Sequence, residues 1–162
     1  MKGLLLALSA VAVPVVVIAQ TPKRASTQHV VVDVPDSITW NAAPPVLPTG
    51  AKIAVLEGDP AKPGPYTMRL SLPDGYTIPP HFHPGPEHVT VIHGTLQVGM
   101  GAQLDPTKFN DLPEGTFGVI PARMRHFARA KGDVIIQLHG TGPWKLNYVN
   151  AADDPRGRKP AS

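Results

Sequence analysis

The chain has 162 residues and a formal net charge of +3, enough length for one domain but without the clustered basic charge of a nucleic-acid-binding surface. It contains no cysteine, which excludes a disulfide scaffold, a thiolate metal site and a lipid-modified N-terminal cysteine. Its 20 prolines and 15 glycines are more than a helical bundle tolerates, and they favour short strands joined by turns.

The first 19 residues have the order of a secretory signal peptide. Lys2 supplies a positive charge, an apolar run covers residues 3–18, and Ala19 is a small residue at the expected cleavage point. The alternative is an uncleaved membrane anchor. That run has 16 residues and is interrupted by Pro14, whereas a bilayer-spanning helix needs about 20. We expect a signal peptide at residues 1–19 and a periplasmic or secreted mature protein that no longer contacts the membrane.

The rest of the chain alternates β-branched or period-two segments with glycine and proline. We predict strands at residues 29–34, 38–40, 51–56, 66–72, 87–93, 95–100, 116–120, 134–139 and 144–149. Asp105 followed by Pro106 predicts one helical turn. Residues 151–162 are expected to be a disordered tail. Many short strands with turns between them predict a single all-β domain over residues 20–150.

One stretch in the middle of the chain has the residues of a metal site. His81 and His83 are one residue apart, so in an extended segment both side chains point to the same face. A turn at residues 84–86, rich in proline and glycine, then allows Glu87 to return to that side. Two imidazoles and one carboxylate that converge from a short segment form a ligand set for a first-row transition metal.

A second stretch adds Gly115, Pro121 and His126, and together the two stretches resemble the paired motifs of the cupin superfamily. The second motif departs from the pattern at Arg123, where cupins usually have glycine, and at Ala130, where many have asparagine. The first motif matches at every position, namely Gly75, His81, His83, Glu87 and Gly94.

The resemblance implies a single cupin β-barrel of the double-stranded β-helix or jelly-roll type. It also implies one divalent transition metal (Fe, Mn, Zn, Ni, Co or Cu) held by His81, His83, Glu87 and His126. Four protein ligands would leave two positions of an octahedron open, whereas a closed four-coordinate structural site leaves none. Only the resemblance predicts a strand at residues 125–130, because their own propensity is helical.

Four further residues are candidates for binding a substrate or supporting the metal ligands, namely His93, Arg123, Gln137 and His139. The first shares a strand face with Glu87, and the last two share a face of a later strand. Arg123 follows in the turn before His126 and could clamp a carboxylate, although a solvated arginine is the alternative.

Two functions of different classes are compatible with this sequence. The first is a metalloenzyme that binds an oxygen-bearing small molecule at an open 3-His/1-Glu site, with dioxygenase-like or Lewis-acid chemistry. Cupins with this ligand set include dioxygenases, isomerases, decarboxylases and lyases. The second is a non-catalytic metal- or ligand-binding sensor module. We expect no regulatory partner domain, and this expectation favours the enzyme. An exposed edge at residues 29–34 would permit a homodimer.

Overall fold

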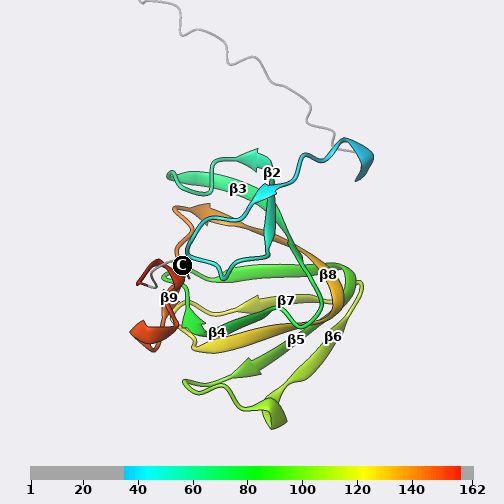
Figure 1. The fold of residues 1–162 in the computed structure, drawn as a ribbon. Coiled ribbons are helices and arrows are strands. Elements are labelled where there is room, and N and C mark those ends of the chain that lie inside the picture. Colours follow the sequence, from blue (N-terminus) through cyan, green and yellow to red (C-terminus); the bar gives the residue numbers. More distant parts are fainter. Residues whose placement is uncertain (1–34, 158–162) are drawn as a thin grey trace, which may run out of the picture. The chain divides into compact units, whose positions relative to one another are not determined.

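A computed structural model describes residues 35–157, and these form an antiparallel β-structure (Figure 1). The predicted signal peptide, the predicted strand at residues 29–34 and residues 158–162 lie outside the described residues. The strands are β1 (Asn41–Ala42), β2 (Lys52–Gly58), β3 (Gly64–Leu72), β4 (Thr77–Phe82), β5 (Glu87–Met100), β6 (Asn110–Pro113), β7 (Phe117–Ile120), β8 (His126–Gly142) and β9 (Asn147–Tyr148).

The helices between residues 35 and 157 are short 3-10 turns. They are η1 (Pro35–Ser37), η2 (Pro106–Lys108), η3 (Ala151–Asp153) and η4 (Pro155–Gly157). None of them is long and apolar enough to cross a bilayer. The turn predicted at Asp105 is η2, and its N-cap is Asp105, whose carboxylate accepts a hydrogen bond from the backbone N–H of Thr107.

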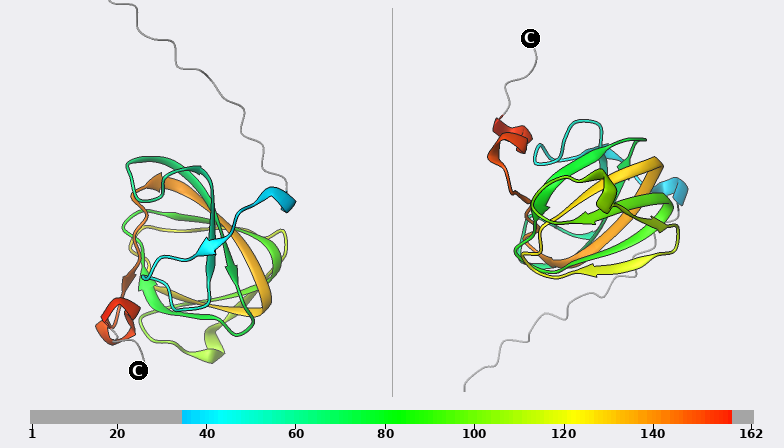
Figure 2. Two further views of the ribbon diagram at one scale, coloured as in Figure 1. Left: turned by 45° about the horizontal axis from the view of Figure 1, so that its top comes forward. Right: turned by 90° about the horizontal axis from the view of Figure 1, so that it is seen from below.

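The long strands β5 and β8 are shared by two curled layers of the sheet. The first half of β5 and the second half of β8 pair with each other, and they are flanked by β7 and by β3, β2 and β1. The second half of β5 and the first half of β8 pair in turn, flanked by β6 and by β4 and β9. Figure 2 shows the sheet closing around an interior. The predicted all-β barrel is confirmed.

Glycines bend the two long strands where the sequence predicts turns. Gly94 has φ +78°, and a Cβ placed there would lie 2.3 Å from the carbonyl oxygen of Asp133. Gly132 has φ +72° but faces open space. β5 and β8 continue through these glycines. Each is therefore one bent strand, where the sequence analysis predicted two separate strands joined by a turn.

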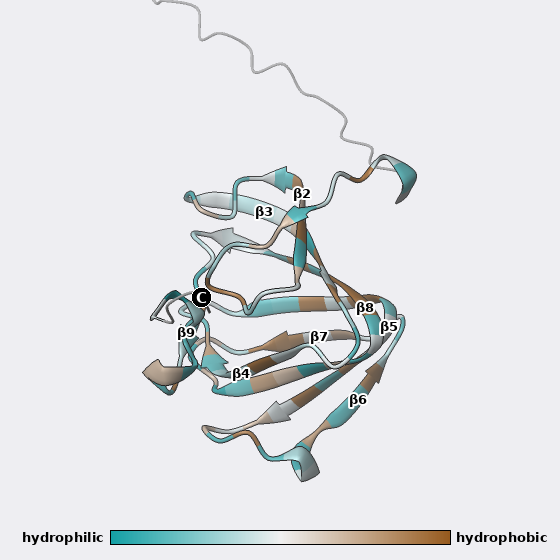
Figure 3. Ribbon diagram, viewed as in Figure 1, coloured by the Kyte–Doolittle hydropathy of each residue, from teal (hydrophilic) through white to brown (hydrophobic). Residues whose placement is uncertain are grey.

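Apolar residues from both layers form the buried core. Figure 3 shows hydrophobic residues in brown along the strands. The predicted inward face of β3 is confirmed, since each of its apolar members is at most 4% exposed: Tyr66, Met68, Leu70 and Leu72. The residues of β5 that face the interior are odd-numbered before the bend and even-numbered after it. Val89 and Val91 are buried before the bend, and Leu96 and Val98 are buried after it. The register of β5 shifts on both sides of His93, which accounts for the change.

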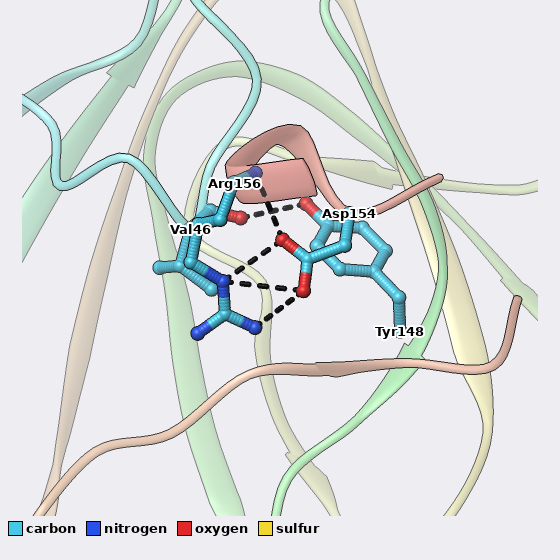
Figure 4. A network of polar contacts seen from close by, with 4 residues as sticks. All are labelled: Val46, Tyr148, Asp154 and Arg156. Carbon is cyan, nitrogen blue, oxygen red and sulfur yellow. Dashed lines mark hydrogen bonds and ion pairs between the residues drawn. The ribbon is translucent and has the colours of Figure 1, made fainter. Parts of the chain in front are cut away.

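The C-terminal part of the described chain differs from the sequence prediction. The strand predicted at residues 144–149 is reduced to β9, and residues 151–157, expected to be disordered, form η3 and η4. Figure 4 shows two contacts in this region. The hydroxyl of Tyr148 donates to the carbonyl oxygen of Val46 over 2.8 Å, and Arg156 forms an ion pair with Asp154. The Asp154–Arg156 ion pair is a local contact in the segment after β9, whereas the Tyr148 bond attaches β9 to a loop far away in the sequence.

Candidate metal centre

Three histidines from the two motifs meet inside the barrel. His81 on β4 is the cross-strand partner of His126, the first residue of β8, and their ring centroids are 4.2 Å apart. His83 follows β4, with its ring centroid 5.1 Å from that of His81. All three residues are at most 5% exposed. One ring nitrogen from each lies within 4.8 Å of the others, so this cluster could hold a metal ion.

Backbone carbonyls fix the tautomer of each ring. The Nδ1 atoms of His81, His83 and His126 lie 2.8, 2.7 and 3.0 Å from the carbonyl oxygens of Pro79, Lys145 and Met124. Because a carbonyl oxygen only accepts hydrogen bonds, each Nδ1 carries the proton and donates it. In the neutral ring, Nε2 is then left with a lone pair, which is the form that binds a metal.

Glu87 brings a carboxylate to the same place from the start of β5. Its side chain is 11% exposed, with Oε1 3.3 Å from Nε2 of His83 and Oε2 3.5 Å from Nε2 of His126. Within the described residues, the buried Nε2 of His83 has no hydrogen-bond partner. Nitrogen lone pairs that face a carboxylate repel it unless a cation neutralises the group. The residues therefore fit a bound metal ion.

The pKa values of His81, His83 and Glu87 agree with two neutral rings beside an ionised carboxylate. Burial, assisted by the neighbouring imidazoles, lowers the pKa of His81 to about 3. Burial also lowers the pKa of His83, although the Glu87 charge opposes this. For Glu87, burial alone raises the pKa, but the contact with His126 and the nearby imidazoles outweigh it and lower the pKa to about 2. Neutral imidazole and ionised carboxylate are the metal-binding forms at neutral pH.

Arg123 contributes through its backbone. It has φ +63°, the left-handed conformation that favours glycine, so the turn keeps the shape that the usual glycine would give. Its N–H donates to the carbonyl oxygen of His83 over 2.8 Å, which joins the two motifs. The Arg123 side chain is exposed and does not line the cavity of the cluster. The exposed side chain agrees with the solvated arginine that the sequence left as the alternative to a carboxylate clamp.

His93 does not belong to the site. Its side chain is 63% exposed, and Nδ1 lies 3.3 Å from Oε2 of Glu114. The prediction assumed uninterrupted alternation from Glu87, but the register shifts beside His93 turn its side chain outward.

Gln137 and His139 share a face of β8, but it is the outer face. The apolar residues of that segment, Val134, Ile136 and Leu138, take the interior. Gln137 accepts a hydrogen bond from Nε of Arg69, and the ring of His139 stacks at 5.0 Å on that of His88. Neither residue lines the cavity of the histidine cluster, so the structure does not bring them to the predicted metal ligands.

The cluster lines a small cavity together with side chains that the sequence analysis did not assign to the site. The cavity has a volume of about 30 Å³ available to the centres of water molecules, room for about two waters. Trp144 lines it and stacks on His83, with ring centroids 5.8 Å apart and an interplanar angle of 28°. No spacing signal in the sequence connects Trp144 to the histidines, because it lies after β8 and is positioned by the tertiary fold.

A bent double-layered β-barrel with three convergent histidines from two glycine-bounded motifs is the arrangement of a cupin. The family model described as the ChrR cupin-like domain matches residues 27–145, and the chain belongs to this family. No curated protein matches the chain significantly.

Solved structures confirm the fold. The polyketide cyclase RemF from Streptomyces resistomycificus is 13% identical, with a TM-score of 0.63 over 76% of this chain and 88% of that one. A putative acetylacetone dioxygenase from Methylibium petroleiphilum is 20% identical, with a TM-score of 0.59 over 80% and 88%. A chain of the Rhodobacter sphaeroides complex of SigE with the anti-sigma ChrR is 19% identical, with a lower TM-score of 0.48 over 65% and 51%, and the fold assignment does not rest on it. At these identities the likeness concerns the fold alone.

Proposed function

We propose that this chain is an exported, metal-dependent cupin enzyme that acts on a small oxygen-bearing organic substrate. The supporting observation is the convergence of three Nε2 atoms and one carboxylate in a buried cavity. A divalent first-row ion would be held by His81, His83, Glu87 and His126. Such an ion, when bound, supplies Lewis-acid chemistry or, if it is redox-active, dioxygenase-like chemistry.

The chain's own residues set the conditions for that chemistry. Three neutral imidazoles and the Glu87 carboxylate leave a divalent ion with one net positive charge, which favours oxygen ligands that are anionic or strongly polarised. Four protein ligands leave two octahedral positions for such oxygens. The surrounding aliphatic side chains limit access of water and strengthen the electrostatic interactions inside the cavity.

Openness of the site is tested with cobalt(II)-loaded protein and acetohydroxamate, a small bidentate oxygen ligand. The proposal predicts a change in the visible spectrum without release of cobalt, measured on the protein after gel filtration. No spectral change, or removal of the metal, would indicate a closed structural site. Oxygen uptake by the iron(II) form with small phenolic and diketone compounds then separates oxygenase from non-redox chemistry.

The family assignment favours one alternative of a different class, a non-catalytic binding module. The family model is named for ChrR, and the ChrR of Rhodobacter sphaeroides is an anti-sigma factor. Such a module would bind its ligand once per chain and leave it chemically unchanged. Multiple turnovers of one substrate per metal ion support the enzyme, and strictly stoichiometric binding supports the module.

A further inference from the structure

The wall of the metal cavity carries almost no polar groups. Apart from the three histidines, Glu87 and Trp144, every lining side chain is aliphatic, as illustrated by Leu70, Ile78, Val89 and Ile136. Among residues 35–157, no lysine, arginine, serine, threonine or tyrosine lines it. A charged group of a ligand, other than the oxygens on the metal, would therefore be buried there without a partner. Burying an unpaired charge is strongly unfavourable.

In the part of the chain that the structure describes, Trp144 provides the one side-chain hydrogen-bond donor of this wall outside the histidine and glutamate cluster. Its indole Nε1 is buried and has no hydrogen-bond partner within residues 35–157. Leaving a buried donor without a partner is unfavourable, so an acceptor supplied by a ligand would relieve this cost.

The position of Trp144 is set by its backbone. Its N–H donates to the carbonyl oxygen of Pro60 over 2.7 Å. The ring lines the metal cavity and also a surface depression of about 390 Å³ with Pro44, Val46 and Ile53. Trp144 thus lies between the metal cavity and the outside, where a ligand entering from this side passes it.

We infer that this site selects compact ligands that carry no charge beyond their metal-binding oxygens, and that Trp144 is the residue that positions them through its indole N–H. The inference rests on the proposed function, because it requires a metal with open positions. It names the substrate class as short, apolar-bodied oxygen chelators. Dicarboxylates, amino acids and phosphorylated compounds are excluded by the lack of a cationic partner in the wall.

Two matched ligands test the charge selection. Propionohydroxamate and malonomonohydroxamate share the chelating group, but the second has a carboxylate in place of the terminal methyl. Each is titrated into the cobalt(II)-loaded protein, followed by its visible spectrum, and into free cobalt(II) as a reference. After correction for the reference, we expect the neutral ligand to bind about 100-fold more tightly or better. Equal affinities would overturn the inference and leave the proposed function intact. Binding of neither ligand by metal-loaded protein would contradict both.

The indole N–H is tested with Trp144→Phe, which keeps an aromatic ring beside His83 and removes the donor. We expect unchanged cobalt content and thermal midpoint, with about tenfold weaker binding of propionohydroxamate, as for the loss of one hydrogen bond. Trp40→Phe is the matched control, since Trp40 does not line the cavity, and it should bind as the wild type does. Unchanged affinity in Trp144→Phe would overturn the positioning role. If Trp144→Phe loses cobalt, Trp144 has a structural role instead, and the two-ligand comparison on the wild type still decides the charge selection.

Discussion

The backbone N–H of Arg123 donates to the carbonyl oxygen of His83 over 2.8 Å, so the turn before one histidine of the buried cluster is joined directly to another histidine of that cluster. This bond requires the left-handed backbone that Arg123 adopts. The turn therefore tolerates an arginine at a position where glycine is usual, but the conformation restricts which side chains can replace it.

Replacing Arg123 separates the backbone requirement from any role of the guanidinium. Arg123→Gly should change the free energy of unfolding by less than about 0.5 kcal/mol, because relief of the left-handed strain offsets the greater entropy of the unfolded chain. Arg123→Val should lower it by about 2 kcal/mol, because β-branched side chains are rarely tolerated at positive φ. Urea denaturation measures both. A larger loss in the glycine variant than in the valine variant would show that the side chain matters more than the turn.

The glycines at the bends of β5 and β8 allow a second prediction, in which Gly132 is the control for Gly94. Gly94 and Gly132 both have positive φ, but only Gly94 has a backbone oxygen where a Cβ would lie. Gly132→Ala should cost about 1 kcal/mol of stability from the backbone conformation alone. Gly94→Ala should cost at least about 3 kcal/mol, because Asp133 would have to move. Thermal unfolding compares the two, and similar losses would contradict the close approach of the strands.

The stability of the metal-free protein should depend on pH through His81. The pKa of His81 is lowered to about 3 from its usual 6.5, so the unfolded chain binds the proton first as the pH falls. The free energy of unfolding then falls from pH 6.5 downward, by about 2 kcal/mol at pH 5 for this residue. Glu87, lowered to about 2 from 4.5, adds a loss in the same direction below pH 4.5.

This pH dependence is measured by thermal unfolding of chelator-treated protein at pH 7.5 and at pH 5. His81→Asn should reduce the difference between the two midpoints, because the variant has no group that titrates in this interval at that position. An equal difference in the wild type and the variant would show that His81 is not held neutral by burial.

Much of the fold and part of the candidate site are predictable from local patterns. Alternation in residues 66–72 identifies the buried face of β3, and the one-residue separation of His81 and His83 explains why both rings reach one cluster. The apolar alternation of Val134, Ile136 and Leu138 also indicates that Gln137 and His139 face outward. The sequence therefore carries the signal that these two side chains face away from the interior.

Other features depend on tertiary structure that no local pattern encodes. The register shifts beside His93 reverse the inward face of β5, and alternation alone cannot reveal them. The backbone carbonyl oxygen of Lys145 accepts a hydrogen bond from the ring of His83. Because every residue has such a carbonyl, the residue type at this position gives no sign of the contact. Trp144 reaches the cavity only because its backbone is bonded to Pro60, far away in the sequence.

Export is a separate prediction that rests on the order of residues 1–19. When expressed in a Gram-negative host, the mature protein should begin at Gln20 and be recovered from the periplasm or the medium. Intact mass spectrometry of each fraction measures this. Full-length protein in the membrane fraction would mean that the apolar segment remains as an anchor.

If His81, His83, Glu87 and His126 bind one metal ion, the amount of metal per chain in the purified protein should show it. The wild type and single variants are purified without added metal and analysed by mass spectrometry for metal per chain. We predict about one equivalent in the wild type, most of it lost in His83→Ala. His88→Ala is the control, because His88 stacks on His139 at the outer face, and it should retain the metal. Equal metal content in His83→Ala and His88→Ala would contradict the ligand assignment.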